Sequence, residues 1–284
     1  MGKIGVIGYG HMGSVMLNSL LSVKAVAPKD IIISTRTSQK LEALKTAYPD
    51  IETAASNKEV AKRSNTLFLC VGTKDVKPVL TEILDVLNED THLITISGGV
   101  EMASIEQLFH GKISKIMPTL ISEVHEGVTL ICHNTQIEPD KQEFLLKIFT
   151  KIGQVKLIEE HQFDICSNLT SCFPAFIASI CHHFIQSGVK QSDLTYDEAV
   201  KMVLHTLYGT ANLLLHNDDD LISFVNRVAT KGGATEQGTR VLDKYLPNIF
   251  LELYQATTDL NEERKRATRS QFEHVPHGVS IYVN

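Results

Sequence analysis

The sequence predicts an α/β protein in which an amino-terminal doubly wound sheet is followed by an all-helical region. In the first half, short β-branched or apolar runs alternate with helical patterns, which is typical of parallel strands joined by crossover helices. After about Glu160 the pattern changes to long helical segments with few strand signals. We therefore expect two domains, residues 1–158 and residues 159–284.

Each element of the first domain is expected from its own hydrophobic pattern. The expected strands are residues 3–7, 31–34, 66–71, 92–97, 115–117 and 128–132. The expected helices are residues 11–24, 38–48, 57–63, 74–87, 101–109 and 139–151.

The second domain shows helical periodicity. Residues 196–216 carry an apolar stripe at helical spacing, which is either core or a subunit interface. The acidic run 218–220 precedes the apolar segment 221–228, and acidic residues at a helix start complement its exposed N–H groups, which favours capping over metal binding. The last long helix is expected to begin at Pro247 and to run to about Arg269.

Composition favours a soluble cytoplasmic protein. Lys and Arg total 27 against 33 for Asp and Glu, without a long basic block, so nucleic acid is not an expected partner. The start of the chain lacks export-signal features, and no continuous apolar run approaches the ~18 residues of a membrane span, so no membrane partner is expected. The 5 cysteines are irregularly spaced and predict reduced thiols. The segment 181–183 (CHH) lacks a second ligand pair at zinc spacing, so no metal site is expected.

Residues 8–13 (GYGHMG) carry the first functional motif, because they directly follow an expected strand and open an apolar helical pattern. In that context Gly8 permits a tight turn, and Gly10 lets the backbone approach a pyrophosphate. Gly13 allows the helix to pack closely on the strand. The motif predicts a Rossmann-type dinucleotide site with the anion at the helix N-terminus; the alternative is a merely tight turn between strand and helix.

The end of the second expected strand indicates which dinucleotide binds. An NAD-selective site normally offers Asp or Glu there, whereas residues 34–37 (STRT) contain no carboxylate. Arg36 is suited to pair with a 2′-phosphate, so NADP(H) is favoured over NAD(H). Lys40 either assists or is a solvated helix residue. The cofactor-binding residues predicted from these two motifs are Gly8, Gly10, His11, Met12, Gly13, Ser34 and Arg36.

Two segments of the helical half resemble the pyrroline-5-carboxylate reductase family. Residues 168–176 (NLTSCFPAF) are similar to the stretch that leads into that family's long helix. Residues 228–235 (VATKGGAT) are similar to its signature of two glycines followed by Ala or Thr and then Thr. Further similarities lie at residues 98–100, 117–118 and 126–129, so the resemblance spans residues 3 to about 265.

The resemblance implies NADPH-dependent reduction of a cyclic imine, most directly 1-pyrroline-5-carboxylate to L-proline, the last step of proline synthesis. It implies a homodimer or higher homo-oligomer with helical dimerisation domains, and substrate contacts from Cys172 and from backbone N–H groups of Gly232, Gly233 and Ala234. Thr235 is the implied catalytic residue, since it hydrogen-bonds the imine nitrogen. Hydride donation depends mainly on orientation of the nicotinamide, so the lack of an evident His–Asp pair is compatible with this reaction. By the same resemblance Val71, Gly72 and Lys74 join the cofactor-binding residues.

The loops around the implied substrate site differ from the family pattern. Residues 71–74 (VGTK) lack the usual lysine and proline, residues 119–121 lack an amide, Phe173 replaces a glycine and Lys231 replaces a proline. Several of these changes resemble the late competence operon branch of the family. The alternative function is therefore an NADP-binding protein of that branch without proline-pathway turnover, with a regulatory role or a different substrate. A 3-hydroxyacid dehydrogenase has a similar glycine turn, but residues 164–189 lack the lysine that it needs.

Overall fold

The computed structural model describes residues 2–88, 90–217 and 220–273. The chain packs as two compact units: unit 1 combines Met1–Ser171 with Thr258–Asn284, and unit 2 is Cys172–Thr257. These units describe packing, and the domain boundary expected between residues 158 and 159 stays a prediction.

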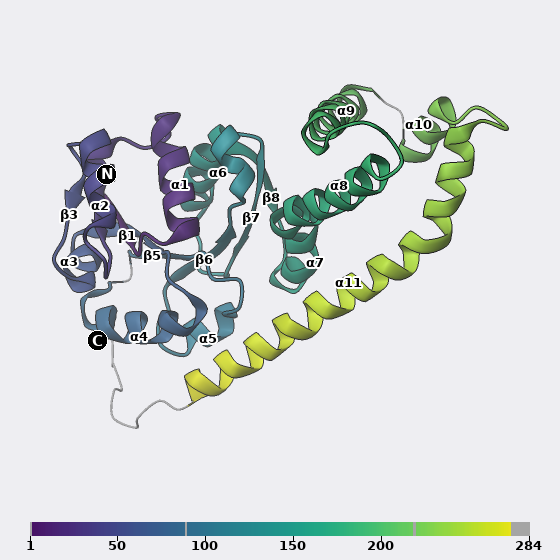
Figure 1. Cartoon of the computed structure of the whole chain (residues 1–284). Helices are drawn as coiled ribbons and strands as arrows, with labels where there is room; N and C mark the ends of the chain where they lie inside the picture. Colours follow the sequence, from purple (N-terminus) through teal and green to yellow (C-terminus); the bar gives the residue numbers. More distant parts are fainter. Residues whose placement is uncertain (1, 89, 218–219, 274–284) are drawn as a thin grey trace. The chain divides into compact units, whose positions relative to one another are not determined.

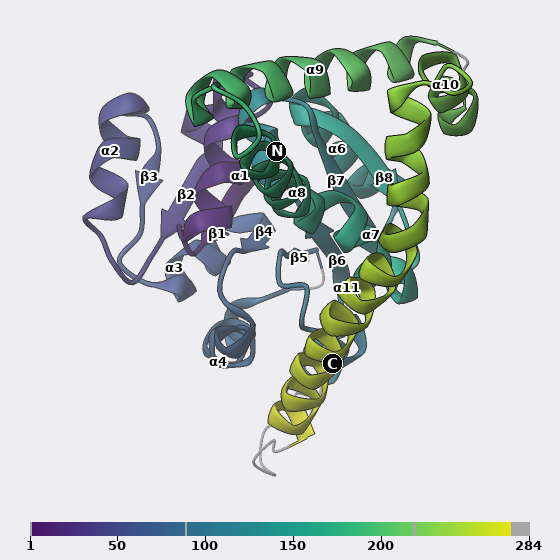
Figure 2. The same cartoon turned by 45° about the vertical axis from the view of Figure 1, so that its right-hand side comes forward.

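Unit 1 is built on an eight-stranded sheet, counted over the described residues. Its strands are β1 (Lys3–Ile7), β2 (Ile31–Ser34), β3 (Glu52–Thr53), β4 (Ser64–Leu69), β5 (His92–Thr95), β6 (Lys112–Met117), β7 (Gly127–His133) and β8 (Gly153–Leu157). The spatial order is β3-β2-β1-β4-β5-β6-β7-β8, and Figure 2 shows β3 and β8 at opposite edges. Because the chain leaves β1 in one direction and returns to its other side at β4, a crevice opens between the carboxyl ends of these two strands.

Helices cover both faces of this sheet, as Figure 1 shows for α1 and α6 on one face and for α4 and α5 on the other. The first apolar cluster packs α1 (His11–Ser22), α2 (Lys40–Ala47) and α6 (Pro139–Phe149) against the sheet. The second cluster packs α3 (Asn57–Lys62), α4 (Thr73–Ile83), α5 (Met102–Glu106) and α7 (Phe163–Ser167). Phe272, near the end of the chain, is fully buried in the second cluster. The doubly wound fold is confirmed.

The carboxyl-terminal region is helical, as predicted. After the π-helical segment Asn168–Cys172 it contains α8 (Phe173–Val189), α9 (Tyr196–His216), α10 (Leu221–Val228) and α11 (Ala234–Glu273). Thr195 and Glu198 form a reciprocal capping box at the start of α9. Asp220 accepts a hydrogen bond from the Ser223 N–H at 2.8 Å, so the capping predicted for α10 is confirmed at this residue. Asp218 and Asp219 lie outside the described residues.

The apolar side chains of unit 2 are mostly not buried by the chain itself. Among its described residues, Ile185 is the one buried hydrophobic side chain. Phe184 is 70% exposed, and Leu204 and Leu215 of the α9 stripe are 52% and 84% exposed. The stripe is therefore not a core within one chain, which leaves a subunit interface as its interpretation.

Three sequence-based expectations need correction. First, the last helix begins at Ala234 rather than at Pro247, because the turn at Gly232, with φ of +78°, ends the preceding segment and the helix starts directly after it. Pro247 lies inside α11, where it removes one backbone donor from a helix of 40 residues. Second, β6 and β7 are antiparallel, because the short connection through the 3₁₀ turn Leu120–Val124 cannot hold a crossover helix. Third, β3 and β8 were not expected, because β3 has only 2 residues and β8 ends next to the expected domain boundary.

One helical stretch of the described chain, Glu160–Val189, is long and apolar enough to cross a membrane by length and composition. Polar residues interrupt the apolar ones in this stretch without making it polar on average. The expectation concerned a continuous apolar run, which this stretch is not, and the absence of a membrane partner stays a prediction. A helix at a subunit interface or in the core of a soluble protein meets the same criterion.

Candidate functional site

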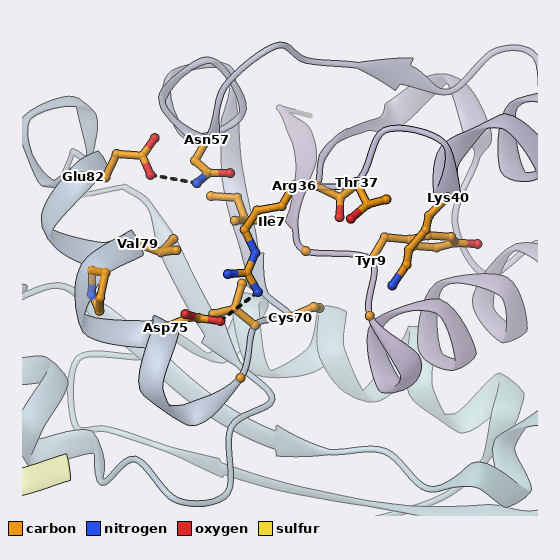
Figure 3. A pocket seen from close by; sticks show the side chains of 16 residues that line it. Ile7, Tyr9, Arg36, Thr37, Lys40, Asn57, Cys70, Asp75, Val79 and Glu82 are labelled. Carbon is orange, nitrogen blue, oxygen red and sulfur yellow. Dashed lines mark hydrogen bonds and ion pairs between the residues drawn. The ribbon is translucent and has the colours of Figure 1, made fainter. Parts of the chain in front are cut away.

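A cavity of about 410 Å³ lies at the carboxyl ends of β1 and β4, at the point where the strand order reverses. Its walls come from the turn after β1, the loop after β2, the start of α3 and one side of α4 (Figure 3). A second cavity of about 300 Å³ shares the residues around Gly10 and Gly72 with the first and extends to the loop after β5. The two cavities form an elongated site, which suits a dinucleotide.

Each of the three glycines of the motif has the backbone geometry or the space that a dinucleotide-binding turn requires. Gly8 has φ of +98°, and an added Cβ would lie 2.5 Å from the carbonyl oxygen of Cys70. A Cβ on Gly13 would lie 2.8 Å from the Cβ of Cys70, so a glycine is needed for α1 to pack this closely. Gly10 has no atom within 4 Å of an added Cβ, so its backbone faces open space. As the N-cap of α1, Gly10 brings no side chain to the helix N-terminus, which leaves room there for an anion.

A chain of side-chain hydrogen bonds lies on one wall of the first cavity. The buried Ser34 hydroxyl donates to Oδ1 of Asn57 at 2.8 Å, and Nδ2 of Asn57 donates to Oε2 of Glu82 at 2.8 Å. Sequence reasoning missed Asn57 and Glu82, because an Asn at a short helix start and a Glu on a helix surface have ordinary structural roles. Proximity to the second strand's end, which only the fold reveals, is what marks them.

Arg36 reaches into the same cavity from the loop after β2. Its Nη2 donates to Oδ2 of Asp75, in the first turn of α4, at 3.2 Å. The Arg36 side chain is 88% exposed and that of Asp75 is 40% exposed, so solvent screens this pair and leaves Arg36 accessible. Lys40 also lines the cavity. Asp75 was missed, since nothing in the sequence links it to a residue 39 positions earlier.

The second cavity contains a pair of hydroxyl groups. The side-chain oxygens of Thr73 and Ser97 are 2.9 Å apart, and the Ser97 N–H donates to Oγ1 of Thr95 at 3.1 Å. Cys70 lies between the cavities, and burial raises the pKa of its thiol to about 12, so it stays a neutral packing group.

The predicted cofactor residues are brought together to different degrees. Most of them line at least one of the two cavities: Gly8, Gly10, His11, Met12, Gly13, Arg36, Val71 and Gly72. Ser34 is connected to the first cavity through Asn57. Lys74 lies outside both linings, and its backbone carbonyl accepts a hydrogen bond from Nε2 of Gln271. The roles assigned to all of these residues stay predictions.

The predicted substrate residues Gly232–Thr235 lie at the start of α11. The Gly232 N–H donates to Oε2 of Glu236 at 2.6 Å, so the turn already holds a carboxylate of its own. That hydrogen bond, followed by the charge of Arg240, lowers the pKa of Glu236. Thr235 is exposed, and Cys172 is partly buried with a pKa raised by burial. Their roles stay predictions.

Each half of the chain matches a known family model. Residues 3–99 match the family model described as NADP oxidoreductase, coenzyme F420-dependent. Residues 160–264 match the family model described as pyrroline-5-carboxylate reductase dimerisation. The apolar faces left exposed in unit 2 lie within the second match.

Individual relatives cover nearly the whole chain. Pyrroline-5-carboxylate reductase 3 of Bacillus subtilis is 32% identical over 258 residues, which is 90% of this chain and 94% of that protein. ComE operon protein 4 of the same organism is 27% identical over 270 residues, which is 95% and 99%. The solved structure of a pyrroline-5-carboxylate reductase from Coxiella burnetii is 25% identical with a TM-score of 0.84, covering 93% of this chain and 98% of that one.

Proposed function

The chain belongs to the pyrroline-5-carboxylate reductase family, and on that premise we propose that it reduces 1-pyrroline-5-carboxylate, or a closely related cyclic imine, with NADPH. It is an oxidoreductase of the class that acts on C=N bonds. The observation that carries the proposal is the cavity at the ends of β1 and β4, in which Gly10 presents open backbone at the start of α1. This arrangement suits a nicotinamide dinucleotide.

Different residues of the cavity are suited to hold different parts of the cofactor. The N-terminus of α1 faces the position of the pyrophosphate, and Arg36 and Asn57 line the part suited to the adenosine ribose. Thr73 and Ser97 line the part suited to the nicotinamide. When bound, NADPH supplies the hydride that the imine carbon accepts. The chain's own task is orientation of the two reactants.

The proposed substrate contacts come from the turn before α11. The Gly232 N–H already binds a carboxylate oxygen of Glu236, which supports a role for this turn in holding the substrate carboxylate. We assign Thr235 to the imine nitrogen, where its hydroxyl fixes the orientation of the ring. Gly233, Ala234 and Cys172 complete the proposed substrate-binding set.

We further propose a cytoplasmic homodimer, or a higher homo-oligomer, that prefers NADPH to NADH. The exposed apolar faces of α8 and α9 support the oligomer, because a stable soluble chain rarely leaves so much apolar area uncovered. Arg36 and the absence of a carboxylate from residues 34–37 support the cofactor preference.

A second candidate function is that of the late-competence branch, with cofactor binding but no proline-pathway turnover. It is supported by the similarity to ComE operon protein 4 and by the changed loop at Thr119. The Thr119 side chain is buried, and its Oγ1 would lie 2.7 Å from a Cβ added to Gly127. This side chain packs inward, where the family resemblance implies an amide that contacts a ligand.

One experiment separates the two candidates. Purified protein is first titrated with NADPH and NADH by calorimetry, and NADPH oxidation is then measured with 1-pyrroline-5-carboxylate and with imines of other ring sizes. The first function predicts saturable oxidation with a carboxylated ring. NADPH binding without oxidation by any of the imines would contradict it and favour the second candidate.

A further inference from the structure

The first cavity contains a negative charge at the position where its cofactor would bring another. Figure 3 shows the Arg36 side chain extending across the cavity to Asp75, with Asn57 and Glu82 on the neighbouring wall. Arg36 therefore already has an anionic partner at 3.2 Å in this structure.

The second carboxylate, Glu82, is oriented differently. It accepts a hydrogen bond from Nδ2 of Asn57, and Oδ1 of the same Asn57 accepts one from the Ser34 hydroxyl. Glu82 is thus held against the polar wall, while Asp75 is the carboxylate in contact with the guanidinium. Both residues belong to α4 and both line the cavity.

A 2′-phosphate and Asp75 compete for the same guanidinium. Phosphate binding by Arg36 requires its N–H groups, of which at least one is donated to Asp75. Once bound, the phosphate would lie close to the carboxylate, and like charges at that separation repel. The 2′-hydroxyl of NADH is uncharged and needs neither contact.

We propose that Asp75 is a specificity-determining residue of the cofactor site, which lowers the affinity for NADPH and leaves the affinity for NADH nearly unchanged. The chain then discriminates between the two dinucleotides less than Arg36 alone would allow. This inference rests on the proposed function only in taking the cavity as the dinucleotide site, and it does not depend on the substrate.

The test uses the full-length protein and four variants: Asp75→Asn, Arg36→Ala, the double variant, and Asp90→Asn as a control. Asp90 lies just before the amino end of β5, opposite the cavity, and its replacement changes the net charge equally. Dissociation constants for NADPH and NADH are measured by calorimetry. The same measurements with 2′,5′-ADP and 5′-AMP isolate the adenosine end from the nicotinamide end.

Asp75→Asn is expected to tighten NADPH and 2′,5′-ADP by about fivefold, a size set by the exposure of the pair, while NADH and 5′-AMP change by less than about twofold. Asp90→Asn is expected to change none of the four. In the Arg36→Ala background, the gain in NADPH affinity caused by Asp75→Asn should be smaller, because only the direct repulsion between the 2′-phosphate and the Asp75 carboxylate is then removed. Higher salt concentration should also reduce this gain in NADPH affinity, because ions screen the charges.

Several outcomes overturn the proposal. These are an unchanged NADPH affinity in Asp75→Asn, equal gains for NADPH and NADH, or the same gain in Asp90→Asn. Failure of all four ligands to bind the unaltered protein overturns both this proposal and the proposed function. Binding with the expected selectivity, but without imine reduction, contradicts the proposed reaction and supports the assignment of Asp75.

Discussion

Unit 1 and unit 2 differ in how they bury their apolar residues. Unit 1 encloses two apolar clusters, one on each face of its sheet, and the strands β1, β2 and β4 to β7 contribute buried residues. Unit 2 buries one hydrophobic side chain among its described residues and exposes others such as Phe184 and Leu215. The first unit completes its core within one chain, whereas the second offers surfaces that suit a partner.

The two proposed binding regions follow the same division. The cofactor cavity is enclosed by four elements of unit 1, so its geometry is fixed by a packed sheet. The turn at Gly232 is held by local contacts, namely those with Glu236 and Thr230. We therefore expect cofactor binding to persist in a monomer, and imine reduction to depend on the assembled oligomer.

The largest effect is expected from variants that disrupt the oligomer and leave unit 1 unaltered. Phe184→Glu or Leu204→Glu would place a charge on the proposed interface. We expect the dissociation constant of the dimer to rise at least about 100-fold. Sedimentation equilibrium should then show a monomer that still binds NADPH but has lost imine reduction. Gln136→Glu, in an exposed turn of unit 1, is the control. An unchanged oligomer in both interface variants would show that these faces are not the interface.

The second effect separates folding from cofactor binding within unit 1. Gly10 has an extended backbone, with φ of −79°, and open space around its Cβ position, so Gly10→Ala should fold normally. Its methyl group would lie where the pyrophosphate must approach the backbone, and NADPH affinity should fall at least about tenfold. Gly8→Ala should instead lower the melting temperature, because of its φ of +98° and the close Cys70 carbonyl. Full NADPH affinity in Gly10→Ala would contradict the assigned turn.

A third effect concerns the stability of unit 1 in acid. Nε2 of His92 lies 2.7 Å from Oγ of Ser114, which lies 2.6 Å from Nδ1 of His133. Burial, with smaller contributions from neighbouring charges, lowers the pKa of His92 to about 3 from its usual 6.5. The unfolded chain therefore binds this proton first, and stability is lost as the pH falls from about 6.5 towards 3.

Between pH 7 and pH 5 this residue should reduce the free energy of unfolding by about 1 to 2 kcal/mol. Urea titrations at several pH values measure the loss. His92→Gln should flatten the dependence, leaving the smaller part that comes from the lowered pKa of His133. His110→Gln, at an exposed position, should leave it unchanged. An equally steep dependence in His92→Gln would show that another group is responsible.

The smallest effect concerns the turn of unit 2. Glu236→Ala removes the carboxylate that occupies the Gly232 N–H and leaves Arg240 without this partner, so the turn becomes more attractive to an external carboxylate. The KM for 1-pyrroline-5-carboxylate should fall about two- to fivefold. The KM for 1-pyrroline, which lacks the carboxyl group, should stay the same. An equal change for both substrates would argue against this turn as the carboxylate site.

The sequence was sufficient to predict features that depend on residues adjacent in the chain. The turn at residues 8–13 was predictable because a strand, three glycines and a helix follow one another within a single motif. The capping of α10 by Asp220 was equally local. Both depend on backbone geometry that a few adjacent residues determine.

Features that join distant parts of the chain were not predictable. Asp75 meets Arg36, and Glu82 meets Asn57, only because the sheet order brings α4 beside the end of β2. The antiparallel pairing of β6 and β7 was missed, since hydrophobic periodicity does not encode strand direction. The start of α11 differs from the prediction because proline, although common in a first helical turn, lies inside this helix, and the glycine turn at Gly232 sets the start.

The burial of Phe272 has a consequence for how the protein is made. Gln271 bonds to the carbonyl of Lys74, 197 positions earlier, and Phe272 packs beside side chains of α4 and α5. During synthesis from the amino terminus, the cofactor-binding half is therefore released from the ribosome long before the helix that completes its core. We expect folding of that half to finish only once the last turns of α11 are made, and a truncation before residue 272 removes part of the core of the first domain to be synthesised.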